Sequence, residues 1–235
     1  EFYRSSAAAF DASRRTPWPG WRRVLEAADR SRAVSILDVG CGNGRFGLLA
    51  DEILDGRVGY CGVDSSAELL AAARARGPER WRLVESDLFE SELPQGRASG
   101  GFGLVGCFGV MHHLPGRDQR RDLLERMAGR VASGGLLAVS FWQFGDEERF
   151  RRRVVPWTDL AEDDRAPIDV SELEAGDFLL RWGEAGVNPP PLRYCHYCDP
   201  DEAARLVAGL DLEVRDSFRA DGRGDDLNLY YLLGR

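Results

Sequence analysis

The 235-residue sequence contains no lysine: its 31 basic residues are all arginine, and 39 acidic residues bring the net charge to −8. A chain this acidic has no overall positive field to hold nucleic acid non-specifically. An RNA ligand would therefore need a local arginine patch or a basic partner. Long apolar runs are also missing, since none approaches the ~18 residues of a membrane span, and no charged-then-apolar leader opens the chain. We expect a cytoplasmic protein without a membrane partner.

Cysteine is scarce, and its five residues are odd in number, which argues against a disulfide framework. Cys41, Cys61 and Cys107 lie in apolar, strand-like runs. Cys195 and Cys198 have the C-x-x-C spacing, but a structural zinc site usually combines two such pairs, and the sequence holds no second pair. We therefore expect free, buried thiols in a reducing compartment and no bound metal.

Short apolar stretches alternate with helical periodicity along most of the chain. Strands are expected at residues 35–39, 58–63, 81–86, 102–108 and 136–141. Helices are expected at 45–54, after a capping box of Ser65 and Glu68, and along an apolar stripe from Leu123 to Val131 that residues 133–135 would end. This alternation predicts an α/β fold with a mostly parallel sheet and right-handed crossovers.

The C-terminal part of the chain departs from the alternation. Asp199 and Pro200 are expected to begin a helix, and strands at 212–218 and 227–233 then follow with only a loop between them. Two strands joined in this way must pair antiparallel. The full expectation is a Rossmann-like, seven-stranded sheet that ends in an antiparallel hairpin.

We expect one domain over residues 1–235 with two additions to the sheet. The first is an N-terminal helical segment at 1–32, in which a buried face is formed by Trp21, Val24, Leu25 and Ala28. The second is residues 145–192, which are rich in charge, tryptophan and proline and have weak periodicity. We interpret them as an inserted cap on the substrate side, where specificity often resides.

The glycine-rich stretch Asp38–Gly44 follows the first strand directly. Glycines allow positive φ angles and let a ligand lie against the main chain, and the next helix offers free N–H groups to an anionic end of that ligand. Asp64, at the end of the second strand, is placed to accept from ribose hydroxyls. Residues 42–47 also satisfy the G-x-G-x-x-G pattern of dinucleotide-binding enzymes, so a nicotinamide cofactor is the competing interpretation.

Three features favour S-adenosylmethionine (SAM) over a dinucleotide. Asp38 precedes the loop, where SAM enzymes typically use an acid to hold the methionyl amine. Asp87 and Leu88 follow the third strand and suit an adenine contact, and the C-terminal hairpin is the outline of the methyltransferase fold. The predicted cofactor residues are Asp38, Gly40, Cys41, Gly42, Asn43, Gly44, Asp64, Ser65, Asp87, Leu88, Cys107 and Phe108.

Asp38–Gly44, Asp64, Asp87 and the hairpin resemble class I SAM-dependent methyltransferases over residues ~33–235. Three further motifs are similar to those of the tRNA wobble-uridine carboxymethyl methyltransferases. They are Ser13-Arg14-Arg15-Thr16-Pro17-Trp18-Pro19, Val110-Met111-His112-His113-Leu114 and Arg193-Tyr194-Cys195-His196-Tyr197. The sequence departs from the family pattern in three ways. It is acidic, it has Cys195 where the motif has a second tyrosine, and it carries the insertion at 145–192.

The resemblance implies methylation of a carboxylate on a modified uridine at tRNA position 34, which yields a methyl ester. It makes Arg14 and Arg193 candidates to clamp that carboxylate and His196 a candidate to orient it, and it implies a small zinc-binding activator protein as a possible partner. Because His112 and His113 follow the carboxyl end of a parallel strand, one of them should face the site. We favour His112 for that position.

Two other functions remain open from the sequence. The acidity and the tryptophan-rich insertion favour a small-molecule carboxyl- or O-methyltransferase, and a non-catalytic subunit with the SAM fold is the third possibility. A carboxylate acceptor is ionised at neutral pH and needs no general base. An alcohol or amine acceptor would need one, and His112 or His196 would then be the candidate. We expect Trp18 in the core.

Overall fold

A computed structural model of the chain describes residues 16–28, 34–88, 91–96, 100–158, 169–181 and 191–235. Its main sheet has the strand order β3-β2-β1-β4-β5-β10-β9. These strands are β1 (Val34–Val39), β2 (Val58–Asp64), β3 (Arg82–Glu85), β4 (Phe102–Cys107), β5 (Val131–Trp142), β9 (Glu213–Ala220) and β10 (Asn228–Gly234). The strands from β3 to β5 pair parallel, whereas β10 runs antiparallel to both β5 and β9. The predicted fold class is confirmed.

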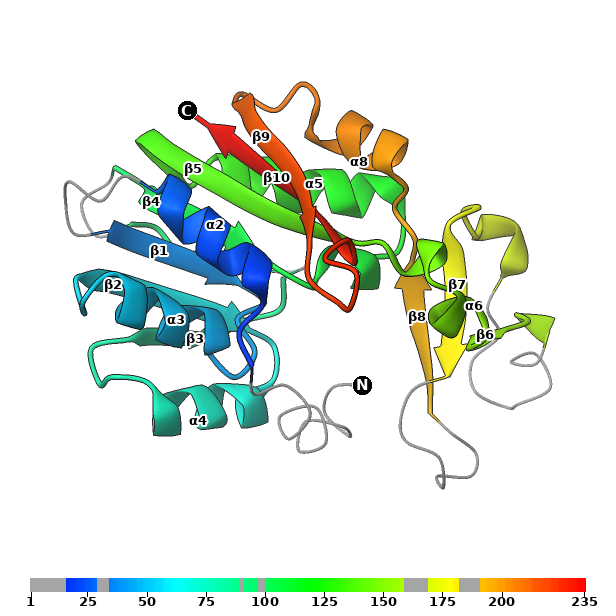
Figure 1. Ribbon diagram of the computed structural model, residues 1–235, viewed down its shortest axis with the longest axis horizontal. Helices are drawn as coiled ribbons and strands as arrows, with labels where there is room; N and C mark the ends of the chain where they lie inside the picture. The colour runs from blue at the N-terminus through cyan, green and yellow to red at the C-terminus, as the bar shows by residue number, and fades with distance from the viewer. Residues whose placement is uncertain (1–15, 29–33, 89–90, 97–99, 159–168, 182–190) are drawn as a thin grey trace.

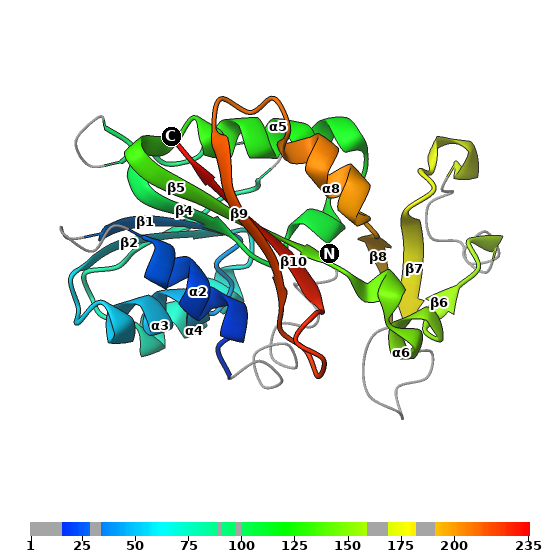
Figure 2. The same ribbon diagram turned by 45° about the horizontal axis from the view of Figure 1, so that its top comes forward.

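Helices cover both faces of this sheet (Figures 1 and 2). On one face lie α2 (Pro19–Ala27), α3 (Arg45–Ile53) and α4 (Ala67–Arg76), and on the other lie α5 (Arg117–Ala128) and α8 (Pro200–Val207). The predicted stripe of α2 is buried together with Ile36 of β1, while Leu37, one residue on, packs on the opposite face with α5 and α8. Within the described ranges no helix is long and apolar enough to cross a membrane.

Two predicted helix boundaries are wrong. The helix expected to continue through Val131 ends at Ala128, and residues 131–135 belong to β5. The backbone of this stretch is bonded across the sheet, because Phe102 N–H donates to Arg130 O (2.7 Å) and Val131 pairs with Phe102. At α4 the cap is Ser66, whose hydroxyl accepts from the Leu69 N–H (3.3 Å), and not Ser65.

A second, smaller sheet occupies the region expected to be an irregular cap. It consists of β6 (Val154–Val155), β7 (Asp177–Arg181) and β8 (Leu192–His196), which pair antiparallel in that order. Short helical turns at η2 (Phe144–Asp146), α6 (Glu148–Arg151) and η3 (Val170–Glu172) connect it. It lies beyond the carboxyl end of β5 (Figure 1). Because β8 is one of its strands, the sheet extends past the expected limit at residue 192.

Buried charged side chains join the small sheet to the main domain. Arg120 of α5 has no exposed side-chain area and is paired with Glu174 and with Glu202 of α8 (3.0 Å). His196 of β8 lies between two carboxylates, with Nδ1 2.6 Å from Asp177 and Nε2 2.9 Å from Glu202. Burial would lower the pKa of His196, but its bonds to Glu202 and Asp177 raise it above the ordinary value. The cluster thus combines one arginine and one histidine with three carboxylates.

Asp221 forms a second buried junction, between the N-terminal helix and the C-terminal hairpin. Its backbone has a positive φ of 71° between β9 and β10. One carboxylate oxygen accepts from the Gly20 N–H of α2 (2.8 Å), and the other accepts from Asn228 Nδ2 (2.8 Å) and from the Tyr230 hydroxyl of β10. Segments 201 residues apart in the sequence are therefore held by one side chain.

We predict that Arg120→Ala lowers the free energy of unfolding by about 3 kcal/mol or more, because it removes a fully buried guanidinium and leaves the partly buried carboxylates of Glu174 and Glu202 without this cation. The matched control is Arg152→Ala. Arg152 is 74% exposed and pairs with Glu148 one turn away, so its loss should change stability by less than about 0.5 kcal/mol. Urea denaturation followed by circular dichroism measures both, and equal losses would contradict the role given to the buried cluster.

Candidate functional site

A cavity of about 310 Å³ opens at the carboxyl ends of β1, β2 and β4. In an open α/β sheet, this is the edge where ligands bind. Its lining comes from the loop after β1, the end of β2, the residues that follow β3 and β4, and the start of α2. The site thus combines segments from most of the N-terminal half of the chain.

The loop between β1 and α3 has the left-handed backbone that only glycine adopts readily. Gly40, Gly42 and Gly44 have φ angles of 74°, 52° and 79°. A Cβ at Gly40 would lie 2.2 Å from Val110 Cγ2, and one at Gly44 would lie 2.8 Å from the Trp81 ring. Both conformation and space therefore require glycine at these two positions.

Asp64 fixes this loop from the neighbouring strand. One of its carboxylate oxygens accepts from the Gly42 N–H (2.8 Å), and the other accepts from the Ser66 N–H (2.9 Å). Burial raises the pKa of Asp64, and the backbone hydrogen bonds oppose that rise. Its carboxylate lines the cavity, where it is available to hydroxyl groups of a ligand.

Asp38 places a second acid in the cavity. It is 2% exposed, and the Tyr60 hydroxyl donates to its Oδ2 (2.6 Å). Burial raises the pKa of Asp38 to about 7, although the bond from Tyr60 lowers it. Tyr60 in turn packs against Trp81, with 4.4 Å between ring centroids. The charge of Asp38 near neutral pH therefore depends on whether a ligand brings a cation to it.

Aromatic rings form another wall of the cavity. Trp18 and Trp21 lie 5.0 Å apart between ring centroids, and Trp21 lies 5.8 Å from Phe108. The Arg45 guanidinium stands 5.2 Å from the Trp21 ring and donates to Thr16 O (2.8 Å). Trp18 was expected in the core, and Arg45 was not among the predicted site residues. Arg45 is the first residue of the helix after the glycine loop, and this position in the sequence could have indicated that it lies at the site.

The structure brings the predicted cofactor residues together. The members that line the cavity are Asp38, Gly40, Cys41, Gly42, Asn43, Asp64, Ser65, Asp87, Leu88 and Phe108. Gly44 and Cys107 do not line it. Gly44 is the N-cap residue of α3, and Cys107 is fully buried in the core of β4, where burial raises its pKa. All five cysteines are buried and free, as predicted.

The predicted catalytic residues are dispersed. Arg14 lies outside the described residues. His113 lines the cavity, and His112 is buried against Trp142 with 4.9 Å between ring centroids, so the preference for His112 is wrong. Both belong to a 3₁₀ turn, η1 (Met111–His113). The two imidazole rings lie side by side, with 3.9 Å between their centroids, but only His113 reaches the cavity lining.

The two candidates on β8 do not line the cavity either. Arg193 is 4% exposed, and its guanidinium lies 5.3 Å from the Trp142 ring. His196 is 1% exposed, and both its ring nitrogens face the carboxylates of Asp177 and Glu202. That arrangement gives His196 a position in the buried charge cluster and leaves its predicted contact with an acceptor without geometric support.

Residues 37–137 match the sequence profile of a family described as a methyltransferase domain. The tRNA (carboxymethyluridine(34)-5-O)-methyltransferase of Saccharomyces cerevisiae is 28% identical over 207 residues, which cover 77% of this chain and 70% of that protein. The dTDP-3-amino-3,6-dideoxy-alpha-D-glucopyranose N,N-dimethyltransferase of Streptomyces fradiae is 37% identical over 115 residues, 48% of this chain and 41% of that protein. The chain spans 64% and 32% of the lengths of the first two curated relatives that it matches.

The fold is similar to that of the DhpI-SAM-HEP complex. The TM-score is 0.65 with 18% sequence identity, and the match covers 100% of this chain and 94% of that one. At this identity the likeness concerns the fold.

We predict that Gly40→Ala lowers the free energy of unfolding by about 1–3 kcal/mol more than Gly134→Ala does. Both glycines have nearly the same positive φ, 74° and 73°, so each variant bears a backbone cost on the order of 1–2 kcal/mol. A Cβ at Gly134 meets nothing within 4 Å, whereas at Gly40 it overlaps Val110, which adds overpacking of about 1–3 kcal/mol. Urea denaturation measures the difference, and equal losses would show that Val110 does not constrain the loop.

Proposed function

We propose that this chain, which is a class I SAM-dependent methyltransferase near the tRNA carboxymethyluridine methyltransferases, transfers the methyl group of SAM to a carboxylate on a modified wobble uridine. The observation that carries the proposal is the cavity between Asp38 and Asp64, which the glycine loop lines along its main chain. The methyl ester is the product, and S-adenosylhomocysteine leaves the same cavity.

The charges of the cavity favour SAM over a dinucleotide. SAM carries a sulfonium and an ammonium group against one carboxylate, so it is a net cation. The buried acid Asp38 and the half-buried acid Asp64 attract a cation and repel the diphosphate of a nicotinamide cofactor. In this pose Asp38 holds the methionyl amine, Asp64 accepts from the ribose hydroxyls, and Asp87 with Leu88 contacts the adenine.

A carboxylate acceptor fits a site without an assigned general base. The sulfonium methyl is already activated, so the protein has to align the acceptor oxygen, the methyl carbon and the sulfur. The carboxylate is ionised at neutral pH, with an ordinary pKa near ~4. Two parallel bonds from an arginine orient it best. Arg14 and Arg193 are the arginines that the family motifs assign to this role, and Arg45 is an arginine of the described cavity lining.

A tRNA substrate is supported by the three motifs and by the S. cerevisiae relative. The acidic chain needs a local basic surface for it, and Arg149, Arg151, Arg152 and Arg153 supply exposed guanidinium groups around α6. Two of them form salt bridges, Arg149 with Glu147 and Arg152 with Glu148. Cytoplasmic location and a zinc-binding activator protein stay predictions from the sequence.

A small-molecule acceptor is the alternative function. The net charge of −8 and the S. fradiae relative, whose name specifies a nucleotide-linked amino sugar, favour it. A non-catalytic SAM-fold subunit is the remaining possibility, and failure of the purified chain to bind SAM would favour it.

The deciding experiment measures transfer of labelled methyl from SAM into two acceptor pools. One is tRNA from cells that accumulate carboxymethyluridine at position 34, and the other is a metabolite extract. We expect a base-labile methyl ester in the tRNA pool. Label in the metabolite pool alone would replace this function by the small-molecule one.

We predict that SAM affinity falls as the pH drops below about 7, by up to tenfold per pH unit, because the methionyl amine pairs with the ionised form of Asp38, whose pKa is about 7. The amine itself stays protonated there, since an α-amino group has a pKa of about 7.7–8.0. Calorimetry between pH 5.5 and 7 measures how the SAM affinity changes with pH.

Two variants test the assignment to Asp38. Asp38→Asn should bind SAM weakly, with an affinity that does not change over this pH range. Tyr60→Phe removes a bond that lowers this pKa and should move the fall to higher pH. A slope that survives in Asp38→Asn would assign the titration to another group.

We predict that Arg193→Ala retains SAM binding but lowers kcat/KM for the carboxylate acceptor about 10–100-fold, the loss of a hydrogen bond to a charged group worth about 1.5–3 kcal/mol. Arg181→Ala is the matched control, because Arg181 is exposed on the neighbouring strand β7. Thermal unfolding verifies that both variants fold. Full turnover in Arg193→Ala would remove Arg193 from the acceptor site.

A further inference from the structure

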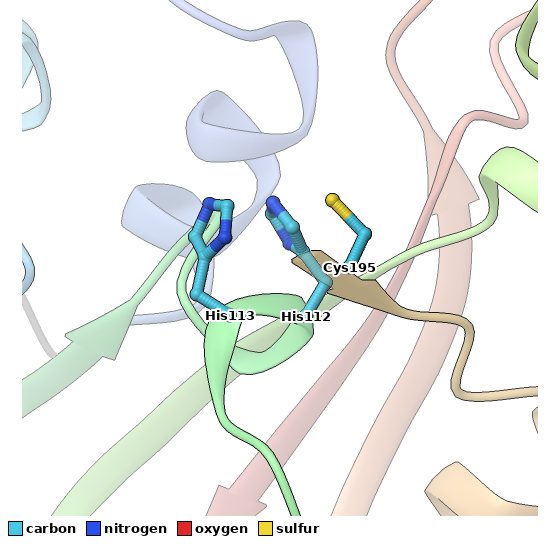
Figure 3. A group of neighbouring side chains, drawn as sticks. All are labelled: His112, His113 and Cys195. Carbon is cyan, nitrogen blue, oxygen red and sulfur yellow. The ribbon is translucent and has the colours of Figure 1, made fainter. Parts of the chain in front are cut away.

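Three side chains of types that can bind a metal ion converge in the structure (Figure 3), and one of them, His113, lines the cavity. His112 and His113 come from η1 and Cys195 comes from β8. One ring nitrogen of each histidine and the cysteine sulfur lie within 4.8 Å of one another. Figure 3 shows the three side chains pointing in the same direction from two separate backbone segments. In the sequence, Cys195 has C-x-x-C spacing with Cys198, and nothing local links it to the two histidines, which precede it by more than 80 residues.

The chemistry of this group suits zinc. Two imidazoles and one thiolate are the N and S donors that Zn²⁺ prefers, and three protein ligands with an open fourth position is the pattern of reactive zinc sites. Bonds of about 2.0–2.3 Å place the ligands of one tetrahedral ion about 3.3–3.8 Å apart. Small side-chain rotations that move each donor atom by about 1 Å would therefore bring all three donors within bonding distance of one ion.

The surroundings also favour a bound ion. Cys195 is fully buried and His112 is 7% exposed, so few water molecules compete for the ligands. A bound Zn²⁺ deprotonates a coordinating thiol outright, and the released proton passes to the solvent.

We propose that His112, His113 and Cys195 bind one Zn²⁺ at the edge of the methyl-transfer cavity, and that its fourth ligand is the acceptor carboxylate. The ion with one thiolate and two neutral imidazoles has a net charge of +1, so an anion completes it. His113 belongs both to this group and to the cavity lining. A carboxylate bound to zinc through one oxygen leaves the other oxygen for the methyl group. Only the identity of the fourth ligand rests on the proposed function.

Glu174, His196 and Glu202 form the other such group among the described residues. Arg120 already supplies a cation to both of these glutamates. A metal ion would have to displace that buried guanidinium, so this group carries no metal proposal.

The test titrates Co²⁺ into chelator-treated, SAM-free protein. Co²⁺ replaces Zn²⁺ with the same ligands and reports a bound thiolate through a sulfur-to-cobalt charge-transfer band. We expect one Co²⁺ per chain with this band, and its displacement by Zn²⁺. Cys195→Ser should abolish the band. Cys198→Ser, a buried cysteine on the same segment outside the group, should keep it. His113→Gln should weaken binding by at least about tenfold.

Each outcome decides the proposal. No band in the wild type, or a band retained in Cys195→Ser, overturns it, and in the second case the metal is bound elsewhere. Circular dichroism verifies folding, and if Cys195→Ser does not fold, wild-type affinity in His113→Gln overturns the proposal. A chain that methylates carboxylates but binds no Co²⁺ refutes the zinc site alone. A chain that binds Co²⁺ without methylating carboxylates refutes the proposed function alone.

Discussion

The site depends on one carboxylate that joins three segments of backbone. Asp64 accepts from Gly42 in the loop after β1 and from Ser66 at the start of α4. It can reach both because β1 and β2 pair in register, with Val39 opposite Val63. The positive φ angles of the loop glycines let the chain turn toward α3 while the loop still lines the cavity. Every other wall of the cavity is placed relative to this bend.

The small sheet is positioned by charge as much as by apolar burial. Its apolar core is limited, with Phe144, Leu180 and Cys195 as the buried members. Arg120 and His196 instead connect it to α5 and α8 through carboxylates. Removing one member of such a network leaves the other charges without their partners and is costly, so the network opposes separation of the sheet from these helices. That arrangement brings β8 beside η1 and sets Cys195 next to the histidines.

The sequence predicted the parts of the molecule that local patterns determine. Apolar alternation located the strands, and the glycine loop with Asp38 and Asp64 located the cavity. Long-range pairing determined what was missed. β7 pairs with β8 through residues such as Phe178 and Cys195, and nothing near either strand indicates its partner. The position of His196 between two carboxylates, and the choice of His113 over His112 as a cavity residue, likewise depend on tertiary contacts and on one 3₁₀ turn.

The junction at Asp221 gives the chain a direction of assembly during synthesis. Trp18 and Trp21 complete one wall of the cavity, but α2, which follows Trp18, is held at Gly20 by a residue of the C-terminal hairpin. The hairpin leaves the ribosome after all the other described elements. A nascent chain can therefore form the glycine bend early, whereas the bond that holds α2 at Gly20 forms only once the hairpin has been synthesised.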